Sequence, residues 1–135
     1  MTQEDKELLM KDLCARLPYG VKVKTWYDKP LVADVYGINR YTFVVSISDV
    51  DEDAKVYLDN VKPYLRPMSS MTEEEREEFN KLVWNSNMGE YDTTLLYWDD
   101  FSTVEDYLNS RHLDYHGLIP KGLAIAVTPE NNPYK

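Results

Sequence analysis

Apolar side chains repeat at helical spacing near the start of the chain, and this pattern predicts an amphipathic helix over residues 2–17. Positions three or four apart share one face of a helix. Thr2 can cap the start of this helix, and Pro18 ends it. The apolar stripe consists of Leu9, Leu13 and Leu17. Cys14 lies on the same side of the helix, so we expect it to be a core residue and not a nucleophile.

Alternating apolar and polar positions then predict three strands, over residues 21–27, 31–36 and 41–48. The clearest alternation is in the third strand, where Tyr41, Phe43, Val45 and Ile47 share one face. Residues 37–40 predict a tight hairpin loop, with Gly37 or Asn39 able to adopt positive φ. Short connections favour antiparallel neighbours, so we expect a β-meander.

Residues 49–53 predict an acidic turn, followed by one further strand or two short ones over residues 55–58 and 61–65. Pro63 and Pro67 lack the backbone N–H that a central strand needs. We therefore expect this part of the chain to form an edge of the sheet.

Two more helices are predicted from their capping signals. Thr72 with Glu75 is a capping box that opens a helix over residues 72–84, and Ser102 with Glu105 opens one that ends near Arg111. Residues 93–98 favour a strand or an extended loop, and residues 123–127 a short strand or coil. The fold class is thus α+β: one domain over residues 1–128, in which a meander of three to five antiparallel strands packs against an N-terminal helix and two further helices. Residues 129–135 are expected to be a flexible tail.

The net charge is −9 over 135 residues, and it is concentrated in the middle of the chain. Residues 49–110 contain 16 acidic and 5 basic side chains, with no Lys or Arg from position 82 onwards. Such a surface repels phosphate, so we expect no direct nucleic-acid binding; a basic protein is the partner it favours. No apolar run approaches the roughly 20 residues of a membrane span, and the acidic N-terminus is unlike a secretory signal. We expect a cytoplasmic location and no membrane association.

Aromatic residues make up 13% of the chain, and many lie in its acidic second half. Tyr and Trp are enriched at the centres of protein interfaces. The candidate interaction residues are Tyr91, Tyr97, Trp98, Asp99, Asp100, Tyr107 and Tyr115. The alternative is that these rings fill the core and direct their hydroxyls to solvent.

Two groups of residues approach metal-site spacing, but neither completes a motif. Asp49, Asp51 and Asp53 match the first ligands of an EF-hand loop, yet Ala54 replaces the required glycine. His112 and His116 are four apart, as in zinc proteases, but Leu113 replaces the catalytic glutamate. The local third ligand would be Asp114, and Asp99 or Asp100 with a histidine could form an acid–base group. We predict no cofactor and no metal site.

Several segments carry a family resemblance: residues 64–75 (YLRPMSSMTEEE), 106–109 (DYLN), 114–119 (DYHGLI) and 121–124 (KGLA). They resemble a family of small proteins from gut anaerobic bacteria and their phages or other mobile elements. That family has no assigned activity. The resemblance implies origin and a cytoplasmic setting, and it transfers no catalytic residue.

Three kinds of function follow from these observations. The first is a non-enzymatic protein-interaction module, with mimicry of DNA by its carboxylates as a special case. The second is a small hydrolase or metal-dependent enzyme with a His/Asp site near His112 and His116. The third is a structural or assembly component of a phage or mobile element.

Overall fold

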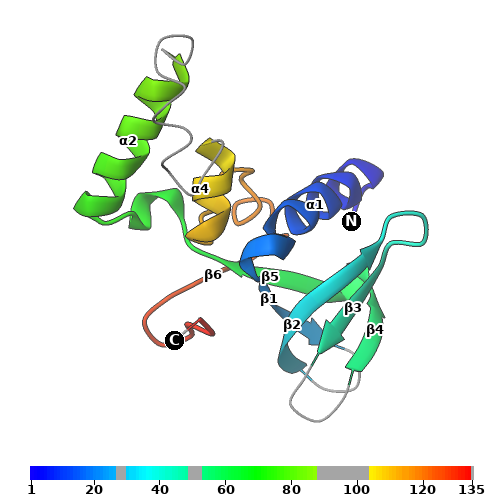
Figure 1. Ribbon diagram of the computed structural model, residues 1–135. Helices are drawn as coiled ribbons and strands as arrows, with labels where there is room; N and C mark the ends of the chain where they lie inside the picture. The colour runs from blue at the N-terminus through cyan, green and yellow to red at the C-terminus, as the bar shows by residue number, and fades with distance from the viewer. Residues whose placement is uncertain (27–29, 49–52, 88–103, 135) are drawn as a thin grey trace.

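The protein is described by a computed structural model that covers residues 1–26, 30–48, 53–87 and 104–134 (Figure 1). It is an α+β fold with an N-terminal helix, a six-stranded sheet and further helices. In chain order the elements are α1 (Gln3–Arg16), η1 (Leu17–Tyr19), β1 (Lys22–Trp26), β2 (Pro30–Asn39), β3 (Val44–Ser48), β4 (Asp53–Tyr57), η2 (Leu58–Asn60), β5 (Val61–Leu65), η3 (Met68–Ser70), α2 (Glu73–Asn87), α4 (Val104–Ser110) and β6 (Ile125–Ala126). None of the helices in these ranges is long and apolar enough to cross a bilayer.

The first helix begins and ends as its sequence predicts. The Thr2 side chain accepts a hydrogen bond from the Asp5 amide at 3.0 Å, and the Asp5 carboxylate accepts one from the Thr2 amide at 3.3 Å. This reciprocal pair satisfies two amides that the helix itself cannot bond. After the short η1 turn, Gly20 adopts φ +82° and leads into β1. That conformation is open to glycine without the steric cost of a side chain.

The sheet has the strand order β4–β3–β2–β1–β5–β6. The first five strands pair antiparallel, and β6 pairs parallel to β5 through Tyr64 opposite Ile125. The sheet is therefore mixed. It has one strand more than the upper limit of the prediction, which was three to five antiparallel strands. The extra strand is the two-residue β6, which lies within the segment predicted to be a short strand or coil.

The hairpin between β2 and β3 is displaced from its predicted position. β2 continues to Asn39 with a bulge between Val35 and Gly37, and the turn occupies residues 40–43. The non-glycine residue with positive φ in this turn is Phe43, at +55°. The prediction placed the turn at the local glycine signal, whereas the glycine is accommodated in the bulge, a common position for it.

The prediction that Pro63 marks a sheet edge is wrong, because β5 lies between β1 and β6. The amide of Val35 donates to the carbonyl of Val21, so this pair is hydrogen-bonded, and bonded pairs alternate along the antiparallel strands. The backbone of Val23 therefore faces β2, and Val23 opposite Pro63 is a non-bonded pair. β6 begins only opposite Tyr64. Neither neighbour requires an amide hydrogen from Pro63, so the proline fits in an interior strand.

One face of the sheet packs against α1 and the segment around Leu118, and this contact forms the main core. Its buried members are Leu9, Met10, Leu13, Val21, Val23, Ala33, Val35, Val45, Ile47, Val56, Leu58, Val61, Leu65, Leu118, Leu123 and Ala124. Cys14 packs against this core and is partly exposed. Of the residues predicted to share one face of the third strand, Val45 and Ile47 are buried, whereas Tyr41 lies in the turn before β3 and is 96% exposed, so the prediction is wrong for Tyr41.

A second, smaller cluster joins α2 to α4 at the β5–β6 end of the sheet (Figure 1). Its buried members are Leu82, Tyr107, Leu108 and Leu113, with Phe79 packed against them. The capping box of Thr72 and Glu75 is present, and α2 extends a few residues beyond the predicted end. Arg66 holds Glu75 by two hydrogen bonds of 2.9 and 2.7 Å, which tie β5 to the start of α2.

The C-terminal segment returns to the sheet. The Tyr134 hydroxyl accepts a hydrogen bond from the Lys22 amide at 3.1 Å and donates one to the Tyr64 carbonyl at 2.7 Å. It thus bridges β1 and β5 just beyond their last paired residues, Val23 and Pro63. The flexibility expected of residues 129–135 stays a prediction, but Tyr134 has a defined place against the sheet.

Candidate functional site

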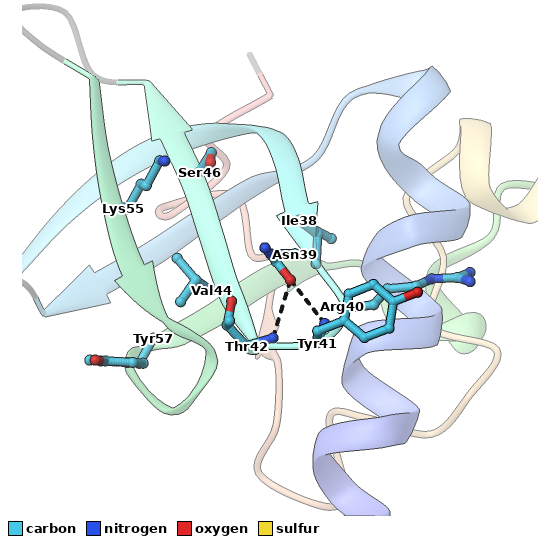
Figure 2. A pocket seen from close by; sticks show the side chains of 9 residues that line it. All are labelled: Ile38, Asn39, Arg40, Tyr41, Thr42, Val44, Ser46, Lys55 and Tyr57. Atoms are coloured by element: carbon cyan, nitrogen blue, oxygen red, sulfur yellow. Dashed lines mark hydrogen bonds between the residues drawn. The ribbon is translucent and has the colours of Figure 1, made fainter.

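The face of the sheet that points away from the core carries a depression of about 740 Å³ at the β2–β3–β4 end (Figure 2). Its lining residues are Ile38, Asn39, Arg40, Tyr41, Thr42, Val44, Ser46, Lys55 and Tyr57. Two of them are cationic, Arg40 and Lys55, and none is acidic. This local excess of positive charge is opposite in sign to the net charge of −9 of the chain.

The hairpin turn is shaped by Asn39. Its side-chain oxygen accepts hydrogen bonds from the amides of Tyr41 at 2.9 Å and Thr42 at 3.2 Å (Figure 2). An asparagine at this position commonly organises such a turn. Phe43, in the left-handed conformation, packs against the core, while Tyr41 is 96% exposed. The turn therefore presents Arg40 and Tyr41 at the rim of the depression.

Exposed aromatic side chains continue from this depression over the rest of the sheet. Tyr57 on β4 is 67% exposed, Tyr36 on β2 55% and Trp26 on β1 40%. The Lys24 ammonium lies 5.5 Å from the centre of the Trp26 ring, a cation–π contact. We call the side chains of β1 to β4 that point away from the core the outer face. Tyr and Trp are enriched at protein interfaces relative to the rest of a protein surface.

The cations of the outer face follow from the strand register. Lys22, Lys24 and Lys55 alternate with buried positions, and Lys62 on β5 lies opposite Lys24. Among the residues that the structure describes, two acids share this face: Asp34, bound to Lys22 at 2.9 Å, and Asp53 at the start of β4. The described side chains of this face therefore have an excess of positive charge.

A second site of interest joins α1 to the segment after α4. Asp12 and Arg16, both fully buried, form two hydrogen bonds of 2.7 and 3.0 Å. Arg16 also donates to the Leu113 carbonyl at 2.6 Å, and Nδ1 of His116 lies 2.7 Å from the Asp12 carboxylate. Burial raises the pKa of Asp12, but hydrogen bonds from His116 and Arg16 and the charge of Arg16 outweigh it and hold the pKa below its ordinary value.

A depression of about 530 Å³ adjoins this network and is lined by Lys11, Ala15, Glu105, Asp106, Asn109, Tyr115 and His116. His116 is the one imidazole in that lining, and a carboxylate orients it, as in a general base. The lining contains no serine, threonine or cysteine, however, and no cluster of three metal-ligating side chains occurs among the described residues. The network links α1 to the segment after α4. In the described part of the chain it supplies an oriented imidazole but no nucleophile or metal ligand set beside it.

The two histidines do not share a helix face, so the spacing found in zinc proteases does not apply to them. α4 ends at Ser110, and His112 lies beyond it with φ +61°. His112 stacks on the Tyr134 ring at 3.7 Å between centres, whereas His116 binds Asp12. Burial, with the charges of Arg16 and Arg66, lowers the pKa of His112 to about 4. Asp114 accepts hydrogen bonds from the amides of Leu118 and Ile119, which engages both carboxylate oxygens in backbone contacts.

Most of the predicted interaction residues lie outside the described residues. These are Tyr91, Tyr97, Trp98, Asp99 and Asp100, and the same holds for Asp49 and Asp51 of the acidic turn.

Two of the predicted interaction residues, Tyr107 and Tyr115, are described. Tyr107 is 1% exposed and donates a hydrogen bond to Glu78 at 3.0 Å; burial, then Glu78, raises its pKa to about 12. Its place is thus between α2 and α4, and it does not contribute to an exposed surface. Tyr115 is half-buried, with its ring beside Arg16 and His116.

The sequence pattern pointed to His116 and Tyr115, but not to Asp12, Arg16 or the residues of the outer face. Asp12 and Arg16 are an oppositely charged pair four apart next to the apolar stripe of α1, which was a signal for a buried pair. The strand predicted over residues 21–27 places Lys22, Lys24 and Trp26 on one side by alternation, but nothing in the local pattern joins them to Lys55 and Tyr57. That grouping depends on strand order, which brings distant segments together.

Comparison of the chain with models of known protein families, with curated proteins and with solved structures finds no match.

Proposed function

We propose that this protein is a non-enzymatic interaction module that binds an acidic, extended segment of a partner protein on its outer face. The observation that carries the proposal is the depression at the β2–β3–β4 end, which has Arg40 and Lys55 in its lining and no acidic side chain. Exposed tyrosines at positions 41 and 57 flank these cations.

The combination of rings and cations supports binding to a protein. Tyr and Trp provide large contact areas with little loss of side-chain freedom, and they dominate the energetics of many interfaces. Lysine and arginine beside them select the charge of the partner and accelerate its encounter. The complementary partner is a segment that alternates acidic with apolar side chains.

A protein segment fits these charges better than a nucleic acid does. A phosphate backbone extends far beyond the depression and would approach the acidic remainder of a chain with net charge −9. A short acidic peptide contacts only the positive face. The basic partner expected for residues 49–110, a range that includes β4, stays a prediction, as do the DNA-mimic and assembly alternatives.

An enzymatic role for His116 has less support. Both oxygens of Asp12 bind Arg16, and the side chains around His116 include no aliphatic hydroxyl or thiol nucleophile in the described ranges. A carboxylate–imidazole pair lacking a nucleophile or a metal performs only part of a hydrolytic mechanism.

The test uses the full chain as bait for a displayed library of random 12-residue peptides. We expect the selected peptides to be enriched in Asp and Glu alternating with apolar residues. The double variant Arg40→Glu/Lys55→Glu should bind them about tenfold or more weakly, because repulsion replaces attraction at the two cations that line the depression. The double variant Lys81→Glu/Lys121→Glu makes an equal change of charge at exposed positions away from the sheet, and should bind normally.

Two results would contradict the proposal. One is a selection without acidic enrichment, or with peptides that the Arg40→Glu/Lys55→Glu variant binds equally well. The other is binding of a fluorescent 20-nucleotide oligothymidine more tightly than the best peptide, lost in that same variant. The second result would identify the outer face as a single-stranded nucleic-acid platform instead.

A further inference from the structure

We infer that the partner segment binds by adding a strand to the free edge of β4, an inference that rests on the proposed function. β4 is the last strand of the sheet and pairs only with β3 in the described part of the chain. Its five residues stand at the outer edge of the sheet in Figure 1, beside the depression drawn in Figure 2. Pairing of an extended peptide with such an edge is a common mode of recognition.

The backbone groups that such a strand needs are identified by one hydrogen bond. The amide of Leu58 donates to the carbonyl of Phe43 at 2.9 Å, in continuation of the β3–β4 register. Bonded and non-bonded pairs alternate along antiparallel strands. Val56 and Ala54 therefore direct their amides and carbonyls to β3, while Tyr57, Lys55 and Asp53 direct theirs to the free edge.

The same three residues also carry the exposed side chains of β4, because side chains alternate between the two faces. An added strand would place its own side chains on the outer face beside Lys55 and Tyr57. Directly opposite residues interact across a strand pair. An acidic guest residue beside Lys55 and an apolar one two positions away, beside Tyr57, would match both. Backbone pairing and the positive depression thus select the same peptide.

Lys55 also disfavours the obvious competing occupant, the β4 edge of a second copy. Antiparallel pairing of two copies centred on β4 would place Lys55 opposite Lys55. Like charges in direct opposition are destabilising, and a lysine in the middle of an edge strand is a known protection against self-association. An acidic guest strand removes this penalty and gains an opposite-charge pair.

The test compares backbone-modified forms of the strongest acidic 12-residue peptide from the library. Two versions are N-methylated at alternate residues, in the two possible registers. Strand addition predicts that one version binds about tenfold or more weakly than the unmodified peptide, because its methyl groups replace the amide hydrogens that pair with β4. The affinity of the other version should stay within about twofold of that of the unmodified peptide. In the complex, hydrogen exchange should slow at the amides of Lys55 and Tyr57, and change little at those of Ala54 and Val56.

A variant of the protein tests the same edge from the other side. Tyr57 has φ −72°, which proline adopts without strain, and its amide does not face β3. Tyr57→Pro therefore removes the edge amide, and Tyr57→Ala is the matched control that removes the same ring but keeps the amide. We expect Tyr57→Pro to bind the peptide about fivefold more weakly than Tyr57→Ala.

The possible failures are distinct. A peptide that binds with both methylation registers equal, or without slowed exchange at Lys55 and Tyr57, overturns strand addition and leaves binding to the outer face intact. Absence of any acidic peptide from the selection overturns the proposed function itself. Equal binding by Tyr57→Pro and Tyr57→Ala also contradicts strand addition, because the edge amide would then contribute nothing.

Discussion

The carboxylate of Asp12 on α1 lies 2.7 Å from Nδ1 of His116, which is 104 residues further along the chain. A carboxylate can only accept this hydrogen bond, so Nδ1 carries the proton. The contact joins the first helix to the segment after α4, and it secures the smaller helical cluster to the main core. A buried polar network of this kind specifies one arrangement of the elements that it connects.

Removal of Asp12 should therefore destabilise the fold strongly. Asp12→Ala leaves the buried Arg16 guanidinium without its carboxylate, and we expect a loss of about 3–5 kcal/mol in the free energy of unfolding. Urea denaturation followed by circular dichroism measures this loss. Glu4→Ala, at an exposed position of the same helix, is the control and should change stability little. The double variant Asp12→Ala/Arg16→Leu should recover part of the loss; if it does not, the unpaired charge is not the cause.

His112 should titrate far below an ordinary histidine. Its pKa of about 4 in the folded state lies below the ordinary 6.5. The unfolded chain therefore binds a proton first, so stability declines as pH falls from 6.5 towards 4. NMR titration of the His112 ring should give a midpoint near 4. His112→Phe, which keeps a ring against Tyr134, should weaken the pH dependence of unfolding in that window; a His112 midpoint near 6.5 would contradict the burial.

Glu75 should contribute to acid unfolding in a lower range of pH. The hydrogen bonds from Arg66, opposed by burial and aided by the Thr72 backbone and the charges of Arg66 and Arg111, lower its pKa from 4.5 to about 2. Its contribution to stability is complete above pH 4.5 and is lost as pH falls towards 2. Glu75→Gln should lower the free energy of unfolding by about 1.5–3 kcal/mol at pH 7. It should also weaken the decrease of that free energy between pH 4.5 and pH 2. Glu74→Gln, one residue earlier and exposed, should retain the wild-type profile.

Tyr134→Phe tests how the C-terminal segment is held. The change removes the hydroxyl that bridges the Lys22 amide and the Tyr64 carbonyl but keeps the ring stacked on His112. We expect a loss of about 1 kcal/mol and faster hydrogen exchange at the Lys22 amide. Tyr41→Phe, at a 96% exposed ring, is the matched control. Unchanged exchange at Lys22 in Tyr134→Phe would show that the bridge does not protect this amide.

The local signals in the sequence predicted most elements correctly. The capping residues Thr2 and Thr72 mark the starts of two helices, and alternation at Val45 and Ile47 marks a strand with one buried face. These features depend on neighbours within a few residues, so periodicity and hydrogen-bonding chemistry are sufficient to find them.

Two wrong predictions, the position of the β2–β3 turn and the sheet edge at Pro63, concern local signals that are compatible with two structures. Gly37 permits a turn or a bulge, and the pairing of β2 with β3 selects the bulge. A proline is unfavourable in an interior strand only where the neighbouring strand would accept a hydrogen bond from its missing N–H. In the register of β1 and β5, Val23 and Pro63 are a non-bonded pair, so β1 does not need that N–H. The spacing of His112 and His116 matters only on a continuous helix, and α4 ends before both.

The amino-acid sequence by itself determined the fold class, the helix starts, the buried strand positions and the negative charge of the middle of the chain. The tertiary structure alone decided which distant residues come together: Asp12 with His116, Tyr134 with the Tyr64 carbonyl, and Arg40 with Lys55 and Tyr57 in the lining of one depression. The physical reason is the distance along the chain over which each kind of interaction acts. Helix caps and side-chain alternation act over a few residues, whereas strand order and packing bring together segments that no local pattern connects.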